Sequence, residues 1–131
     1  MAWRRPPLTT WWWAYWGCAD AKDGWYLPSV AAPGGGQSSA SETCQRYYLW
    51  ETCKLKELHV LFGIAGAYTI AIRKNGTVLW SASMSGITEY HRTDFDYDLA
   101  SGDYLDFQLA SSDQVGVDMA VYIRLERPTE F

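Results

Sequence analysis

Apolar and polar residues alternate with a period of two through most of the chain after residue 44, a pattern typical of β-strands with one buried face. The clearest run is 117–126, where Val117, Met119 and Val121 alternate with smaller or more polar residues. The same alternation marks the segments 57–62, 68–72, 78–82, 94–99 and 104–109. Apolar positions do not recur at helical spacing over any long window, so the pattern predicts an all-β protein.

Turn residues separate these predicted strands. Asn75 and Gly76 stand between two of them, and both tolerate the positive φ that a type I′ hairpin turn requires. Ser101, Gly102 and Asp103 precede a further strand in the same way. Short strands with one apolar face and frequent turns favour two packed antiparallel sheets. We therefore predict a jelly-roll-like antiparallel β-sandwich over residues 44–131.

The N-terminal part of the chain does not share this pattern. Residues 1–27 are rich in aromatic residues and are predicted to form an irregular arm that is separate from the sandwich. Residues 28–43 are small and polar, which is typical of a linker or long loop, because such a segment buries little apolar area. Of the eight tryptophans in the chain, the arm holds Trp3, Trp11, Trp12, Trp13, Trp16 and Trp25.

Composition narrows the functional classes. Lys and Arg number 11 against 15 Asp and Glu, a net charge of −4, which argues against nucleic-acid binding through a basic surface. No apolar run reaches the ~18–20 residues of a membrane-spanning helix, so no membrane partner is expected. Cys18, Cys44 and Cys53 lack metal-ligand spacing and are interpreted as reduced thiols, with a Cys44–Cys53 bridge as the alternative.

Four short phrases occur in order along the chain: Tyr26-Leu27-Pro28, Cys53 to Val60, Tyr68 to Gly76, and Leu99 to Leu105. Together they resemble a β-sandwich module of bacteriophage virion proteins, which is found in tail fibres and small head-surface proteins. In that family a basic residue before Asn-Gly is followed further along by Ala-Gly-Asp; here Arg73-Lys74 supplies the basic position and Ser101 replaces the Ala. The resemblance implies a virion location after synthesis in the host cytoplasm, assembly as a homotrimer, and no catalytic residue.

The aromatic arm is too apolar to remain in water. Its residues 11–16 include five aromatic side chains, which together can bury on the order of 750–1,250 Å², more than the largest apolar patch of a typical monomer. The arm therefore docks on its own sandwich, on another subunit or virion protein, or at a membrane interface. We expect the second, and the predicted partner-binding residues are Trp3, Trp11, Trp12, Trp13, Tyr15 and Trp16.

Residues with catalytic or metal-binding chemistry are sparse. His59 shares a predicted strand face with Glu57, and His91 lies near Asp94, but no zinc-ligand spacing or nucleophile motif accompanies them. Asp94, Asp96 and Asp98 alternate along one strand without the pattern of a calcium-binding loop. We interpret both groups as solvated surface residues and expect no catalytic residue, no metal, no cofactor and no enzyme activity.

We thus predict a bacteriophage capsid decoration or cement protein, attached through its arm to other virion proteins. The alternative is a receptor-binding module of a tail fibre or tailspike, which would bind glycan through exposed aromatic side chains. Its candidate residues are Tyr47, Trp50, Tyr90 and Tyr104, whose predicted orientation is outward or ambiguous.

Overall fold

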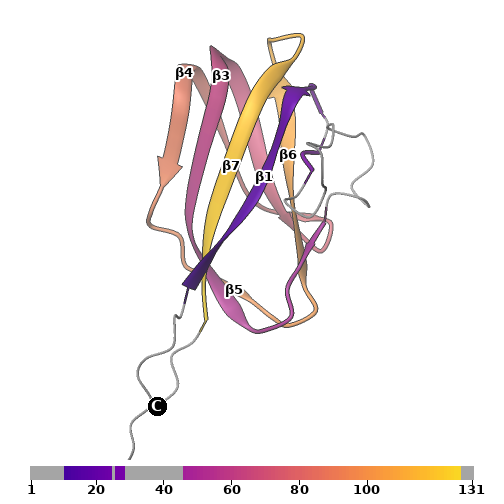
Figure 1. Cartoon of the computed structure of the whole chain (residues 1–131), viewed down its shortest axis with the longest axis vertical. Helices are drawn as coiled ribbons and strands as arrows, with labels where there is room; N and C mark the ends of the chain where they lie inside the picture. Colours follow the sequence, from indigo (N-terminus) through magenta and orange to yellow (C-terminus); the bar gives the residue numbers. More distant parts are fainter. Residues whose placement is uncertain (1–10, 25, 29–45, 128–131) are drawn as a thin grey trace, which may run out of the picture.

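The computed structural model describes residues 11–24, 26–28 and 46–127 (Figure 1). Its strands are β1 (Trp11–Ala21), β2 (Tyr47–Tyr48), β3 (Cys53–Lys74), β4 (Thr77–Arg92), β5 (Tyr97–Leu99), β6 (Tyr104–Ser112) and β7 (Val117–Glu126). The strand pairs are antiparallel, and the predicted all-β class is confirmed. No helix in the described ranges is long and apolar enough to cross a membrane.

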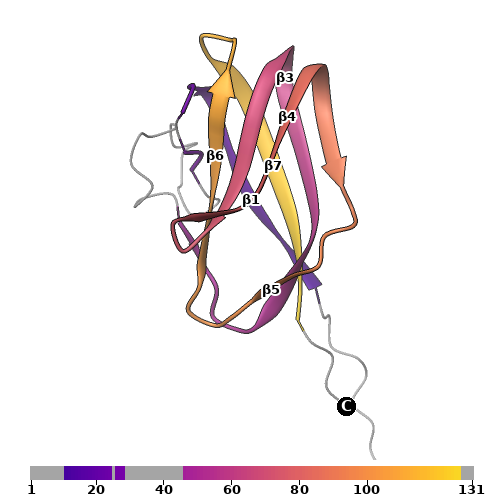
Figure 2. The same cartoon turned by 180° about the vertical axis from the view of Figure 1, so that it is seen from behind.

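The sheet curls into two facing layers, and the long strands β3 and β4 run from one layer into the other (Figures 1 and 2). β3 pairs with β7 over its first half and with β6 over its second half. β4 follows β3 through both layers, with an irregular register between Leu61 and Ala67. One layer, the β1 layer, contains β1, β7, β5, the first half of β3 and the end of β4. The other, the β6 layer, contains β2, β6, the second half of β3 and the start of β4.

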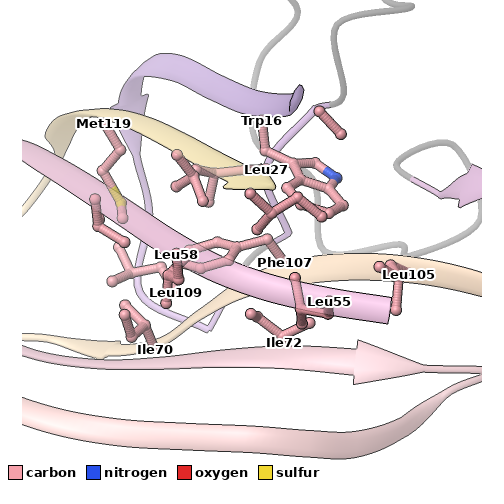
Figure 3. Close-up of a cluster of buried hydrophobic side chains, with 14 of the residues drawn as sticks. Trp16, Leu27, Leu55, Leu58, Ile70, Ile72, Leu105, Phe107, Leu109 and Met119 are labelled. Carbon is pink, nitrogen blue, oxygen red and sulfur yellow. The ribbon is translucent and has the colours of Figure 1, made fainter. Parts of the chain in front are cut away.

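Inward-facing side chains of the two layers form one apolar core (Figure 3). The alternation seen in the sequence of β7 places Val117, Met119, Val121, Ile123 and Leu125 inside. The β6 layer supplies fully buried side chains opposite them, namely Ile70, Ile72, Leu105, Phe107 and Leu109. The predicted antiparallel β-sandwich is therefore the observed architecture.

The Asn75-Gly76 turn forms as predicted. Asn75 and Gly76 have φ angles of 52° and 83°, the two positive values that a type I′ turn needs. The Asn75 side chain also donates to Asp103 Oδ1 at 2.8 Å and accepts a hydrogen bond from the backbone N–H of Tyr104 at 3.0 Å. These bonds fasten the Asn75 hairpin to the turn that precedes β6, so two predicted turns lie side by side.

The structure differs from the sequence analysis at the N-terminal arm. Trp11–Ala21 is not part of a separate irregular arm but a strand of the sandwich, paired along β7 from Trp11↔Glu126 to Ala21↔Val117. The reason is physical, since the inward side chains of this strand cover the core that β7 and β6 would otherwise expose. Trp3, Trp25, Cys44 and positions 29–43 of the predicted linker lie outside the described residues.

A short segment after β1 joins the edges of the two layers. The backbone N–H of Leu27 donates to Phe107 O on β6 at 3.0 Å, and the N–H of Gly17 on β1 donates to Pro28 O at 3.0 Å. Leu27 is fully buried between them (Figure 3). The segment therefore closes the side of the sandwich opposite the bend of β3 and β4.

Candidate functional site

A row of rings crosses four strands on the outward side of the β1 layer. In register, Tyr15 lies opposite Tyr122, Tyr122 lies opposite His59, and His59 lies opposite His91. Alternate residues of a strand share one side, so the remaining outward aromatic residues of β1 extend this row. We call the resulting surface the aromatic face; it consists of Trp11, Trp13, Tyr15, His59, His91 and Tyr122.

Neighbouring rings of the aromatic face contact one another. Ring centroids are 5.1 Å apart for Tyr15 and Tyr122, 5.6 Å for Trp13 and His59, and 6.2 Å for Trp11 and Trp13. Trp13, His59 and Tyr122 line an open hollow of about 430 Å³. This volume lies within the range of small-molecule sites, which are lined by aromatic side chains and a few polar groups.

The outermost rings of this surface stay accessible. Trp11, Trp13 and Tyr122 are 45%, 46% and 39% exposed, so their apolar surface is accessible to a ligand or a partner. Tyr15 is held closer to the sheet, because its ring lies over Gly17, where a Cβ would come within 2.1 Å of the Tyr15 hydroxyl. Burial, together with Tyr122 and Cys18, raises the pKa of Tyr15, so its hydroxyl keeps its proton at neutral pH.

Charged groups border the hollow. Arg124 stands opposite both Trp13 and Glu57 in register, and its Nε donates a hydrogen bond to the Glu57 carboxylate. Burial alone would raise the pKa of Glu57, but the hydrogen bonds from His59 and Arg124 hold it below its usual value. Glu57 is therefore ionised at neutral pH. The aromatic face thus combines apolar rings with a carboxylate acceptor and a guanidinium donor at its margin.

The two histidines are part of a four-residue chain of contacts. His59 Nε2 lies 3.1 Å from Glu57 Oε1, the two Nδ1 atoms of His59 and His91 are 3.0 Å apart, and His91 Nε2 lies 3.3 Å from Glu89 Oε2. His59 lies beside Glu57, as predicted from the sequence. His91 was expected near Asp94, but Asp94 instead accepts two hydrogen bonds from Arg92.

The predicted partner-binding residues divide between the two sides of β1. Trp11 and Trp13 point outward. Trp12 packs against the core and its Nε1 donates to the Tyr47 hydroxyl at 3.1 Å. Trp16 is completely buried and so is not available to a partner. Of the three places considered for the arm, residues 11–21 occupy the first, the chain's own sandwich.

The predicted glycan-binding residues do not gather on the aromatic face. Tyr47 lies beside Trp16, and Tyr90 packs against Trp80 with ring centroids 5.8 Å apart. The Arg46 guanidinium lies over the Tyr104 ring, with its central carbon 4.2 Å from the ring centroid. Trp50 is 89% exposed in the turn region after β2. Their role in glycan binding stays a prediction.

The alternating Asp94, Asp96 and Asp98 are paired with basic side chains in the described structure. Lys54 Nζ lies 3.2 Å from Asp96 and 3.3 Å from Asp98, so cations already partner these carboxylates. Within the described ranges, no group of three or more His, Cys, Asp or Glu side chains is arranged to hold a metal ion. Cys18 and Cys53 are buried, and burial, with Glu51 and Asp103, raises the pKa of the Cys53 thiol to about 11.

Three features of the site were not predicted from the sequence: Tyr122, Glu89 and the contact between His59 and His91. The period-two pattern of β7 already placed Tyr122 on the outward side. What the sequence lacked was the strand order, because β7 neighbours β3 and β1 although it follows them by many residues. The signal that could have found the site is therefore the outward parity of Tyr122 and His59 combined with the correct sheet neighbours.

Comparisons with known proteins give likenesses in structure alone. No protein-family model matches the chain, and no curated protein matches it in sequence. Among solved structures, it is similar to a carbohydrate-binding module, CBM36, in complex with calcium and xylotriose (TM-score 0.43, 20% identity, 62% of this chain and 69% of the other). It is similar to the CBM36-1 domain of a multidomain xylanase from the hindgut metagenome of Trinervitermes trinervoides (TM-score 0.49, 13% identity, 90% of this chain and 99% of the other). It is also similar to the Tobacco streak virus coat protein (TM-score 0.39, 16% identity, 99% of this chain and 94% of the other).

Proposed function

We propose that this protein is a carbohydrate-binding β-sandwich module that takes a sugar ring on its aromatic face. The observation that carries the proposal is the open hollow between Trp13, His59 and Tyr122. One face of a pyranose presents C–H groups that stack on aromatic rings, while its edge carries hydroxyls. Glu57 and Arg124, which neighbour His59 and Trp13 in the sheet, would supply an acceptor and a donor for those hydroxyls.

The form of the hollow favours units of a longer glycan over a small enclosed sugar. The hollow is open, and the aromatic rings continue beyond it along β1 to Trp11. A chain of sugar units can therefore pass over the sheet, with one unit in the hollow and its neighbour against Trp11. We propose binding without turnover as the activity of this face.

The test is a glycan array that carries bacterial surface glycans and plant polysaccharide fragments, followed by titration of the best-bound oligosaccharide. Trp13→Ala and Tyr122→Ala should each weaken binding by about 10-fold or more, equivalent to ~1.4 kcal/mol. Both side chains are well exposed, so the variants should remain folded. Trp50→Ala is the matched control, because it removes an exposed tryptophan outside the aromatic face.

An array without a bound glycan contradicts the proposal, as does full affinity in both aromatic-face variants. Binding that Trp50→Ala removes would instead transfer the glycan site to the residues predicted from the sequence. Circular dichroism on each variant separates lost binding from lost folding.

A protein partner is the second candidate for the same face. The resemblance to phage virion modules favours it, and the exposed Trp11, Trp13 and Leu61 would supply an apolar contact. Attachment to a capsid as a decoration protein and assembly as a homotrimer stay predictions from the sequence. Light scattering tests the trimer, which would have three times the 14.9 kDa mass of the chain. A trimer in which Trp13→Ala yields monomers would favour a protein partner over a glycan.

A further inference from the structure

We propose that His59 and His91 form a binding site for a divalent transition-metal ion, independent of any glycan. The two residues face each other directly on the antiparallel strands β3 and β4, and their Nδ1 atoms are 3.0 Å apart. They are the only two histidines of the chain. Neutral imidazole nitrogens are common ligands of copper, nickel and zinc ions.

Two carboxylates orient the pair for this purpose. The Nε2–H of His59 donates to Glu57 at 3.1 Å, and the Nε2–H of His91 donates to Glu89 at 3.3 Å. With its proton on Nε2, each neutral ring has its lone pair on Nδ1, and the two Nδ1 atoms face each other. A carboxylate on the far nitrogen is the arrangement that fixes the tautomer and the ring orientation of metal-binding histidines.

The spacing favours a particular class of ion. With metal–nitrogen distances of about 2.1 Å, a separation of 3.0 Å between the two nitrogens gives an angle of about 90° at the metal. This is the angle between adjacent ligands in square-planar or octahedral geometry, whereas a tetrahedral zinc site needs about 109°. Copper(II) and nickel(II) adopt these geometries, so the observed spacing would hold either ion with little movement of the two rings. Because no third protein ligand is arranged here in the described part of the chain, water would complete the coordination.

The site is open to ions in solution and lies beside a fluorescent reporter. The side chains of His59 and His91 are 30% and 50% exposed. The two Nδ1 atoms already lie within hydrogen-bond distance of each other, and an ion bound between them would displace to solvent any proton that the pair shares. The Trp13 ring centroid is 5.6 Å from that of His59, so bound copper(II) should quench Trp13 emission.

Calorimetric titration of the full-length protein with nickel(II) chloride tests the proposal. A Cys44→Ser background is used because a thiol can bind nickel(II) and Cys44 lies outside the described residues. The expected result is one nickel(II) ion per chain. Glu89→Gln should weaken binding by about 10-fold, as is typical when the partner of a ligating histidine is removed. His59→Gln and His91→Gln should each weaken it by more, because they remove a ligand.

Spectroscopy gives a readout that folding alone does not change. Electron paramagnetic resonance of the copper(II) complex should show two nitrogen ligands in the parent protein and one in His91→Gln. Equal nickel(II) affinity in the parent and in the double variant H59Q/H91Q would overturn the proposal, and so would the absence of binding up to millimolar nickel(II). No glycan is present in these experiments, so the outcome is separate from that of the proposed glycan binding.

Discussion

The two sides of strand β1 carry the same kinds of residue but have different surroundings. On the inner side, Trp16 is completely buried and its ring centroid lies 6.2 Å from that of Tyr47 and 6.3 Å from that of Phe107. On the outer side, Trp13 is 46% exposed and contacts His59 from a neighbouring part of the sheet. Only three positions along the strand separate these two tryptophans.

The comparison shows that position on the sheet, and not residue type, decides what an aromatic side chain does here. An inward ring displaces water from both layers and stabilises the sandwich. An outward ring leaves much of its surface in water, and its apolar area is available to a ligand.

Trp16→Ala should destabilise the protein by about 3–5 kcal/mol, since it removes a fully buried indole and leaves a cavity in the core. Trp13→Ala should cost less, about 1–2 kcal/mol, because its side chain is 46% exposed and its removal leaves no enclosed cavity. Urea unfolding followed by circular dichroism measures both free energies of unfolding. Equal losses in the two variants would contradict the division between the inner and outer sides of β1.

Burial inside the sandwich also changes the pKa of an ionisable side chain, as Cys53 at the start of β3 shows. Burial raises the pKa of its thiol from 9.0 to about 11, so the folded state disfavours the thiolate. The protonated Cys53 thiol therefore contributes fully to the free energy of unfolding below pH 9. This contribution, on the order of 2 kcal/mol, is lost as the pH rises from 9 to 11.

Urea unfolding at pH 8 and pH 10.5 measures this loss. Cys53→Ala is the matched control: it should be less stable at pH 8 because of the cavity, yet it should lose less stability between the two pH values. An identical pH dependence in the two proteins would show that the Cys53 thiol does not contribute.

The sequence predicted those parts of the fold where apolar and polar residues alternate. The strand over 117–126 and the Asn75-Gly76 hairpin formed as expected, because binary patterning and turn chemistry are local. β1 was missed because aromatic residues occupy both of its sides, so Trp11 to Trp16 show no alternation. The aromatic face was missed for another reason, since it joins four strands whose order in the sheet depends on contacts distant in sequence.

A smaller effect is expected where the outer side of β1 approaches the backbone. A Cβ at Gly17 would lie 2.1 Å from the Tyr15 hydroxyl and 2.9 Å from the backbone oxygen of Met119. Gly17→Ala should therefore push the Tyr15 ring away from the sheet and cost about 1–2 kcal/mol. The same variant should weaken binding at the aromatic face, because the Tyr15 ring packs against that of Tyr122, with their centroids 5.1 Å apart. Unfolding and glycan titration together measure both effects, and unchanged values in both would contradict the contact.

The smallest effect is expected for Trp50, although it is the most accessible tryptophan among the described residues, at 89% exposed. Trp50→Ala should change the free energy of unfolding by less than ~0.5 kcal/mol, as is usual for surface substitutions. It should also leave glycan affinity unchanged, because Trp50 is not one of the rings that line the hollow.

This near-absence of effect sharpens the contrast with Trp13. Both side chains are exposed, but Trp13 lies in a row of contacting rings with Glu57 and Arg124 beside it. If exposure alone made a binding residue, Trp50→Ala would reduce affinity at least as much as Trp13→Ala in the same titration. Loss of affinity in Trp13→Ala alone would show that an organised set of neighbours turns an exposed tryptophan into a binding site.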